Sequence, residues 1–223
     1  MFVCGLVALA AVALLGVARR WRLAASWCAL FGGAMLLVIG SKLGFIGWGI
    51  GIESLNFCGF SGHAARAAAV FPVAFFLMFE AESRRMQNAG VLFAIVCAMV
   101  ITYSRIAVGA HPLSEALSGF SLGLLVAVAF IVMARREAAF RPSAWIVGSV
   151  IAVLTLAPRG EFVQSESFMV PLAIYLSGND HPYLRSTWQR KPTAWAASCP
   201  PDQIFFDYSC FPKGTRKWPK IER

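Results

Sequence analysis

The chain has 223 residues, of which 58% are hydrophobic and 14% are charged, and its formal net charge is +9. Its mean hydropathy is +0.67. A soluble domain of this size cannot bury so much apolar surface, which excludes a single soluble domain and predicts an integral membrane protein. No CxxC, HExxH, Walker or GxGxxG motif occurs in a usable context, so metal, ATP and dinucleotide chemistry have no support. We expect no metal, no cofactor and no nucleic-acid partner.

Charged residues divide the first 157 residues into apolar stretches near the roughly 17–25 residues that a transmembrane helix requires, the last of them short. The stretches are Met1 to Ala18, Leu23 to Gly40, about Ser61 to Phe79, Met86 to Tyr103, Ala116 to Ala134 and Ala144 to Ala157. The pattern predicts an all-α, polytopic membrane helical bundle of about six transmembrane helices over residues 1–157.

The basic residues between these stretches predict the orientation. They gather in three connections, at Arg19–Arg22, Arg84–Arg85 and Arg135–Arg141, which should face the cytoplasm. The other connections, Ser41–Gly62 and Ser104–Glu115, then lie on the extracytoplasmic side. No basic residue precedes the first stretch, so we expect a first helix with its N-terminus outside and no cleavable signal peptide.

Residues 158–223 differ in composition and are predicted to form a basic, extracytoplasmic tail that contains Pro and Trp and is irregular in structure. Its apolar run from Phe168 to Leu176 contains Pro171 and is too short to span a bilayer, which favours an interfacial or re-entrant segment. Cys199 and Cys210 either pair as a disulfide, as an oxidising compartment would allow, or remain free thiols.

A first polar motif, Phe60-Ser61-Gly62-His63, opens the third apolar stretch. Ser61 and Gly62 can offer a hydroxyl and backbone N–H groups at a helix N-terminus, where the helix dipole favours an anion such as phosphate. His63 is placed to give or take a proton at an oxygen of that anion. Alternatively, His63 only caps the helix at the membrane interface.

A second motif combines Ser104-Arg105 with His111 and Glu115. Arg105 supplies a permanently charged fork for phosphate oxygens. Glu115 follows His111 by one helical turn, so its carboxylate can hold one imidazole nitrogen and leave the other free as a nucleophile. Pro112 suits the first position of a helix, which should begin there. Polar and charged groups inside a membrane are costly, so the two motifs together indicate a functional site.

The two motifs together resemble the type 2 phosphatidic acid phosphatase superfamily, whose signature reads KxxxxxxRP, PSGH and SRxxxxxHxxxD. The resemblance covers roughly Lys42 to Glu115 and the helix that follows. It implies that His111 attacks phosphorus to form a phosphohistidine, that Glu115 orients it and that His63 protonates the leaving oxygen. It also implies phosphate binding by Lys42, Ser61, Gly62 and Arg105, and a reaction without metal.

The chain departs from this signature at three places. The Arg-Pro of the first motif falls on Gly49 and Ile50, Phe60 replaces a proline, and Glu115 replaces Asp. Arg66 lies one helical turn after His63 and is our candidate for the missing phosphate-binding arginine. Alternatively, Arg66 snorkels to the membrane interface.

From this pattern we expect a lipid phosphatase that acts on a lipid A, polyprenyl or phospholipid phosphate at the periplasmic side of a bacterial inner membrane. Its partners would be the phosphorylated lipid and the bilayer. Two alternatives are a lipid phosphotransferase that uses the same intermediate and a non-catalytic, lipid-binding member of the family.

Overall fold

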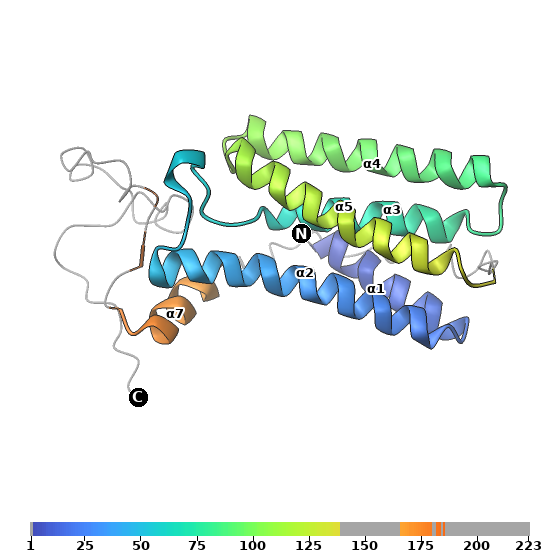
Figure 1. The fold of residues 1–223 in the computed structure, drawn as a ribbon, viewed down its shortest axis with the longest axis horizontal. Helices are drawn as coiled ribbons and strands as arrows, with labels where there is room; N and C mark the ends of the chain where they lie inside the picture. Colours follow the sequence, from blue (N-terminus) through green and yellow to red (C-terminus); the bar gives the residue numbers. More distant parts are fainter. Residues whose placement is uncertain (1, 139–165, 180–181, 184, 186–223) are drawn as a thin grey trace. The chain divides into compact units, whose positions relative to one another are not determined.

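The computed structural model describes residues 2–138, 166–179, 182–183 and 185. These residues form helices and loops, with a single isolated β-bridge between Ile52 and Phe57. Along the chain (Figure 1) the elements are α1 (Phe2–Val17), α2 (Trp21–Trp48), the 3-10 helix η1 (Glu53–Leu55), α3 (Gly62–Met78), α4 (Arg84–Ala107), α5 (Leu113–Ala134) and α7 (Glu166–Ser177). The predicted span at 144–157, Cys199 and Cys210 lie outside the described residues.

The helices confirm the prediction of an all-α membrane bundle. In the described part of the chain, α2, α4 and α5 are long and apolar enough to cross a membrane. Helices α1 and α3 are also apolar but shorter, over Cys4–Gly16 and Gly62–Met78. The largest difference from the predicted boundaries is at α2, which continues for eight residues beyond Gly40 to Trp48.

The chain divides into two compact units. One comprises Met1–Ile39 and Phe60–Gly160, and the other comprises Gly40–Gly59 and Glu161–Arg223. The first contains both polar motifs, α1, most of α2, and α3 to α5. The second contains the last turns of α2, the loop that follows and α7.

Helix α3 lies at the centre of the first unit, in contact with α1, α4 and α5 (Figure 1). A ring cluster joins the core: Trp27 of α2 stacks on Phe31 at 5.1 Å between ring centroids and meets Phe130 of α5 edge-on at 5.3 Å. The Trp27 indole donates a 3.2 Å hydrogen bond to the carbonyl of Ala8, which satisfies its polar group and ties α2 to α1.

Two glycines let α5 approach α3 closely. A Cβ at Gly119 would lie 2.5 Å from the Ser61 carbonyl oxygen, and a Cβ at Gly123 would overlap the carbonyl of Ala65. Small residues four apart allow helix backbones to pack tightly in membranes, where van der Waals contact replaces the hydrophobic effect as the main source of association. This approach fixes the start of α3 against the first turns of α5.

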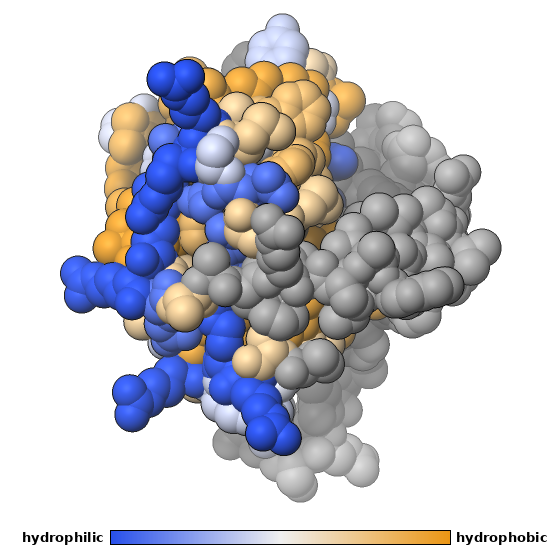
Figure 2. Space-filling model, turned by 90° about the vertical axis from the view of Figure 1, so that its right-hand side faces the viewer, coloured by the Kyte–Doolittle hydropathy of each residue, from blue (hydrophilic) through white to orange (hydrophobic). Residues whose placement is uncertain are grey.

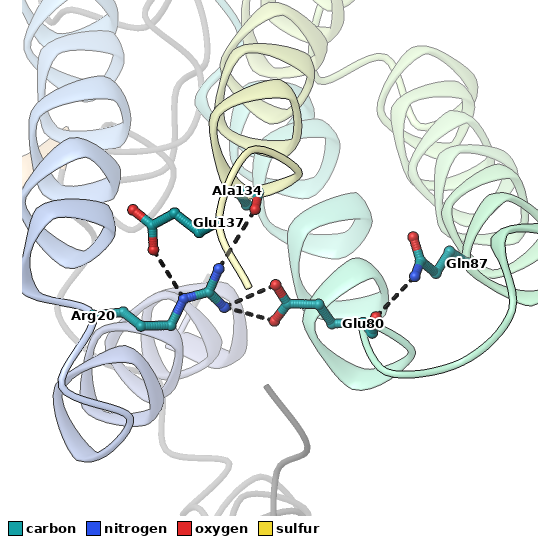
Figure 3. Close-up of polar contacts among 5 residues, drawn as sticks. All are labelled: Arg20, Glu80, Gln87, Ala134 and Glu137. Atoms are coloured by element: carbon teal, nitrogen blue, oxygen red, sulfur yellow. Dashed lines mark hydrogen bonds and ion pairs between the residues drawn. The ribbon is translucent and has the colours of Figure 1, made fainter. Parts of the chain in front are cut away.

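At the far end of the same helices, an ion cluster joins three loops (Figure 3). The Arg20 guanidinium donates to both carboxylate oxygens of Glu80 at 2.7 and 2.8 Å, to Glu137 at 3.1 Å and to the Ala134 carbonyl at 3.5 Å. The Gln87 amide of α4 donates to the Glu80 carbonyl at 2.8 Å. Arg20 and Glu80 are buried, with side chains 9% and 5% exposed, so each needs the other to remain charged there.

This cluster brings the three basic connections of the sequence to one end of the first unit. Figure 2 shows hydrophilic residues gathered on this end beside hydrophobic surface. The exposed cations here are Arg19, Arg22, Arg84, Arg85, Arg135 and Arg136. The prediction that these connections share one face therefore agrees with the packing.

In the second unit, α7 packs on the last turns of α2. Ala173 is fully buried there against Phe45 and Ile46. The Asn179 side-chain amide donates to the Gly47 carbonyl at 2.6 Å, and the Tyr183 backbone N–H donates to the Ile46 carbonyl at 2.8 Å. These donors satisfy carbonyls that the end of a helix leaves unpaired. The tail is thus not irregular throughout, because helix packing orders residues 166–177 despite the internal Pro171.

Candidate active site

Both polar motifs of the first unit lie at the end opposite the Arg20 cluster. Helix α3 begins at Gly62, directly after Ser61, and α5 begins at Leu113, directly after Pro112. The Ser61 backbone N–H donates a 3.0 Å hydrogen bond to the carbonyl of Glu115. Residues that are 54 positions apart in the sequence are therefore joined directly.

His111 and Glu115 form the expected contact. The imidazole Nδ1 lies 2.7 Å from a carboxylate oxygen of Glu115, and the two side chains are 14% and 4% exposed. An ionised carboxylate only accepts hydrogen bonds, so this contact favours the tautomer that has its proton on Nδ1 and its lone pair on Nε2. The pair can thus present a nucleophilic nitrogen.

The loop between α4 and α5 sets the position of His111. The Arg105 carbonyl accepts from the N–H groups of Ala110 at 3.0 Å and of His111 at 3.3 Å. Gly109 turns the chain with a φ of 70°, a left-handed conformation in which glycine is favoured. The loop therefore folds back on the end of α4 and holds the backbone of His111 against that of Arg105.

Several buried polar atoms at this end of the bundle have no hydrogen-bond partner within the described part of the chain. They are the Ser61 hydroxyl, the Arg105 Nε and the Ser114 hydroxyl. Ser61 is fully buried and does not use its side chain to cap α3. Buried polar groups in folded proteins are normally paired, so unpaired donors around His111 and Glu115 indicate a place where a polar ligand binds.

The site carries an excess of positive charge. The positive charges of Arg105 and Arg66 both act on the imidazole of His63. The first N–H groups of α3 lack partners within the helix and add the positive end of its dipole. Such an arrangement is suited to an anion with several oxygens.

The Arg66 side chain, on α3, reaches a sulfur acceptor on α2. Its Nε donates to the Met35 sulfur of α2 at 3.4 Å. A thioether is a weak acceptor and carries no charge, so it does not neutralise the guanidinium. Arg66 can therefore still attract an anion at the start of α3.

Lys42 belongs to the second unit, and its approach to His111 stays a prediction. The structure does explain the missing arginine of the first motif. Gly49 has a φ of 70°, and a Cβ there would lie 2.8 Å from the Tyr183 ring. An arginine at this position would be strained and would collide with that ring.

Sequence reasoning missed Ser114 and Gly119. The G-x-x-x-G spacing of Gly119 and Gly123 could have identified the close approach to Ser61, whereas nothing in the sequence marks the Ser114 hydroxyl as buried and unpaired. Ser104, in contrast, is exposed and donates to the Ile101 carbonyl of its own helix at 2.7 Å. Among the described residues, no group of three or more His, Cys, Asp and Glu side chains is placed to hold a metal ion.

The chain is similar to known proteins in three comparisons of sequence. The sequence model of the PAP2 superfamily matches residues 51–139, which include both motifs but not Lys42. A protein of Klebsiella pneumoniae described as "Uncharacterized 22.5 kDa protein in cps region" is 33% identical over 177 residues, or 78% of this chain and 84% of that protein. "Phosphatidylglycerophosphatase B" of Bacillus subtilis (strain 168) is 39% identical over 71 residues, or 30% of this chain and 34% of that protein. No solved structure matches the chain significantly.

Proposed function

Because this chain belongs to the PAP2 superfamily, whose members include lipid phosphatases, we propose that it hydrolyses a phosphate monoester or diphosphate end of a membrane lipid through a phosphohistidine on His111. The observation that carries this proposal is the 2.7 Å contact between His111 Nδ1 and Glu115, beside the buried Ser61 hydroxyl. Lipid A, polyprenyl and phospholipid phosphates are the candidate substrates.

In the first step, His111 Nε2 attacks phosphorus and the bond from phosphorus to the leaving oxygen breaks. The negative charge of the bound phosphoryl group favours the protonated form of His63. His63 then gives this proton to the leaving oxygen, which departs as a lipid alcohol or, from a diphosphate, as a lipid monophosphate. Glu115 stabilises the positive charge that develops on the His111 ring. The phosphoryl group is then held on His111.

In the second step, water attacks the phosphohistidine, the bond between nitrogen and phosphorus breaks, and His63 takes a proton from the water. Inorganic phosphate leaves and the starting state of both histidines returns. No oxidant, nucleotide or metal takes part in this scheme.

The phosphoryl oxygens would be bound by Arg105, Ser61 and the N–H of Gly62, with Arg66 and Lys42 as further cations. Two of these groups, the Arg105 Nε and the Ser61 hydroxyl, are buried donors without partners in the described part of the chain. A bound phosphoryl group would satisfy both, and these contacts strengthen as negative charge builds up in the transition state.

We further propose that the site faces the periplasm of a bacterial inner membrane. The support is the separation of the two ends of the first unit, with exposed arginines at one end and the motifs at the other. Positively charged connections remain on the cytoplasmic side of a membrane, which directs the motifs outward.

The proposal is tested by incubating the purified full chain with lipid A, polyprenyl and phospholipid phosphates in EDTA and measuring released phosphate. Stopping the reaction in alkali with radiolabelled substrate should trap an acid-labile label on the protein, absent in His111→Ala. Phosphate release by His111→Ala at the unaltered rate, or no release from any lipid phosphate, would refute the proposed function.

A further inference from the structure

Helix α7 carries apolar residues on two sides. One side packs against α2 through Ala173, beside Met169 and Val170. Leu172, Tyr175 and Leu176 lie on another side, with spacings of three and four residues, and are 44%, 58% and 53% exposed. Nothing in the described part of the chain covers this second face, and three large apolar side chains together are costly to leave in water.

Contacts between α7 and the last turn of α2 fix the position of the exposed α7 face along α2. A Cβ at Gly47 would lie 3.1 Å from the Ala173 carbonyl oxygen, so α7 and the last turn of α2 are in backbone contact. The hydrogen bonds from Asn179 to Gly47 and from Tyr183 to Ile46 hold the residues after α7 on the same turn. Helix α7 therefore lies beside residues 45–47 of α2.

The length of α2 gives the depth of that turn in the membrane. Its 28 residues extend over about 42 Å, whereas the hydrocarbon core is about 30 Å thick and is crossed in about 20 residues. If the core starts near Leu23, directly after the basic residues Arg20 and Arg22, it ends near Lys42. Residues 43–48 then lie in the headgroup layer, and so does α7.

Aromatic residues on and beside α7 are of the kind expected in the headgroup layer. Trp48 and Tyr183 are 49% and 43% exposed, and Tyr175 belongs to the exposed face itself. Trp and Tyr are enriched at membrane interfaces, where the ring is in apolar surroundings and the polar atom reaches water.

From these observations we propose that α7 is an interfacial anchor helix, whose face of Leu172, Tyr175 and Leu176 lies in the bilayer at the boundary between headgroups and acyl chains. Its occupant is the lipid surface, not a second copy of the chain. By packing on Phe45 and Ile46, the anchored helix would hold the turn of α2 that carries Lys42 at the level of lipid phosphates. This inference does not depend on the catalytic proposal.

Spin labels test the face directly. Single cysteines at Leu172, Tyr175 and Leu176 would be labelled in a full chain whose native cysteines are replaced, in vesicles of phosphatidylethanolamine and phosphatidylglycerol. We expect high collision with oxygen and low collision with a water-soluble nickel chelate, because oxygen concentrates in lipid. Val100, exposed on α4, serves as the lipid control, and Arg136, exposed at the end of the first unit that carries the Arg20 cluster, serves as the water control.

Two results with the spin labels would overturn the proposal. Access to the nickel chelate at the level of Arg136 would place the face in water, and low access to both reagents would show that protein covers it, either a second copy or another segment of this chain. A phospholipid with a photoreactive group near the top of its acyl chain provides a second measurement on the unaltered protein. Adducts should form on residues 172–176, and adducts on α4 with none on α7 would also refute the anchor.

Discussion

The backbone N–H of Ser61 donates to the carbonyl of Glu115 across 3.0 Å, and this bond joins the helix that carries His63 to the helix that carries Glu115. The Ser118 hydroxyl donates to the same carbonyl at 3.1 Å. Because the Glu115 side chain also holds His111, one residue connects the backbone of the anion site with the nucleophile. The geometry of the two motifs therefore depends on how closely α5 approaches the start of α3.

We expect Glu115→Gln to lower kcat by about 10²–10⁴-fold, because an amide has the shape of the carboxylate but cannot stabilise a positive His111 ring. The KM should change much less, since Glu115 orients the nucleophile and does not bind the lipid. Initial rates of phosphate release over a range of substrate concentrations measure both constants. A kcat within threefold of the unaltered protein would show that the contact is structural only.

Gly119→Ala should destabilise the protein by about 1–3 kcal/mol and reduce turnover, because the new methyl group would meet the Ser61 backbone. The matched control is Gly33→Ala in α2, where nothing lies within 4 Å of the added Cβ. That change should be neutral or slightly stabilising, since alanine favours helix. Thermal unfolding in detergent and phosphate release compare the two variants, and equal behaviour would argue against the close approach.

Arg66→Ala should lower kcat/KM by about 10²-fold if its guanidinium contacts the phosphoryl group, as removal of one transition-state donor does in other enzymes. Arg66→Lys should restore part of the activity, because the charge returns without the fork. Arg22→Ala, at the basic end, is the control and should leave the rate unaltered. If Arg66 is only an interfacial anchor, its removal will lower the amount of inserted protein while the rate per molecule stays the same.

A separate variant tests why the family arginine is absent. Gly49→Arg should not rescue Arg66→Ala, because residue 49 has a φ of 70° and lies against the Tyr183 ring. We expect this substitution to lower the unfolding temperature in the otherwise unaltered protein. Recovery of activity in the double variant would mean that the loop rearranges to accept the side chain.

Arg20→Met should lower the free energy of unfolding by about 3–5 kcal/mol, because it leaves the buried Glu80 carboxylate without its main cation. Combining it with Glu80→Gln should recover much of this loss, since no buried charge then remains. Arg22→Met, at an exposed position in the same region, should have little effect. Thermal unfolding in detergent compares these variants with Glu80→Gln alone and with the unaltered protein, and additive losses in the double variant would contradict a direct ion pair.

The orientation of the protein in the membrane can be measured with introduced cysteines. A cysteine at Asn56, in the exposed loop between α2 and α3, should react in intact cells with a membrane-impermeant thiol reagent. A cysteine at Arg136 should react only after the membrane is made permeable. The reverse pattern would place the site in the cytoplasm.

The sequence by itself determined the apolar helices up to Ala134 and identified the candidate site residues, because a bilayer requires long apolar helices and makes polar motifs costly. The one-turn spacing of His111 and Glu115 was sufficient to predict their contact, since it depends on local helix geometry alone. Only the tertiary structure decided the rest. The Ser61 bond to Glu115, the unpaired Ser114 hydroxyl, the Arg20 cluster and the collision at Gly49 all depend on residues distant in the sequence. The helical structure of α7 also depends on packing, because this short segment contains Pro171 and packs against the end of α2.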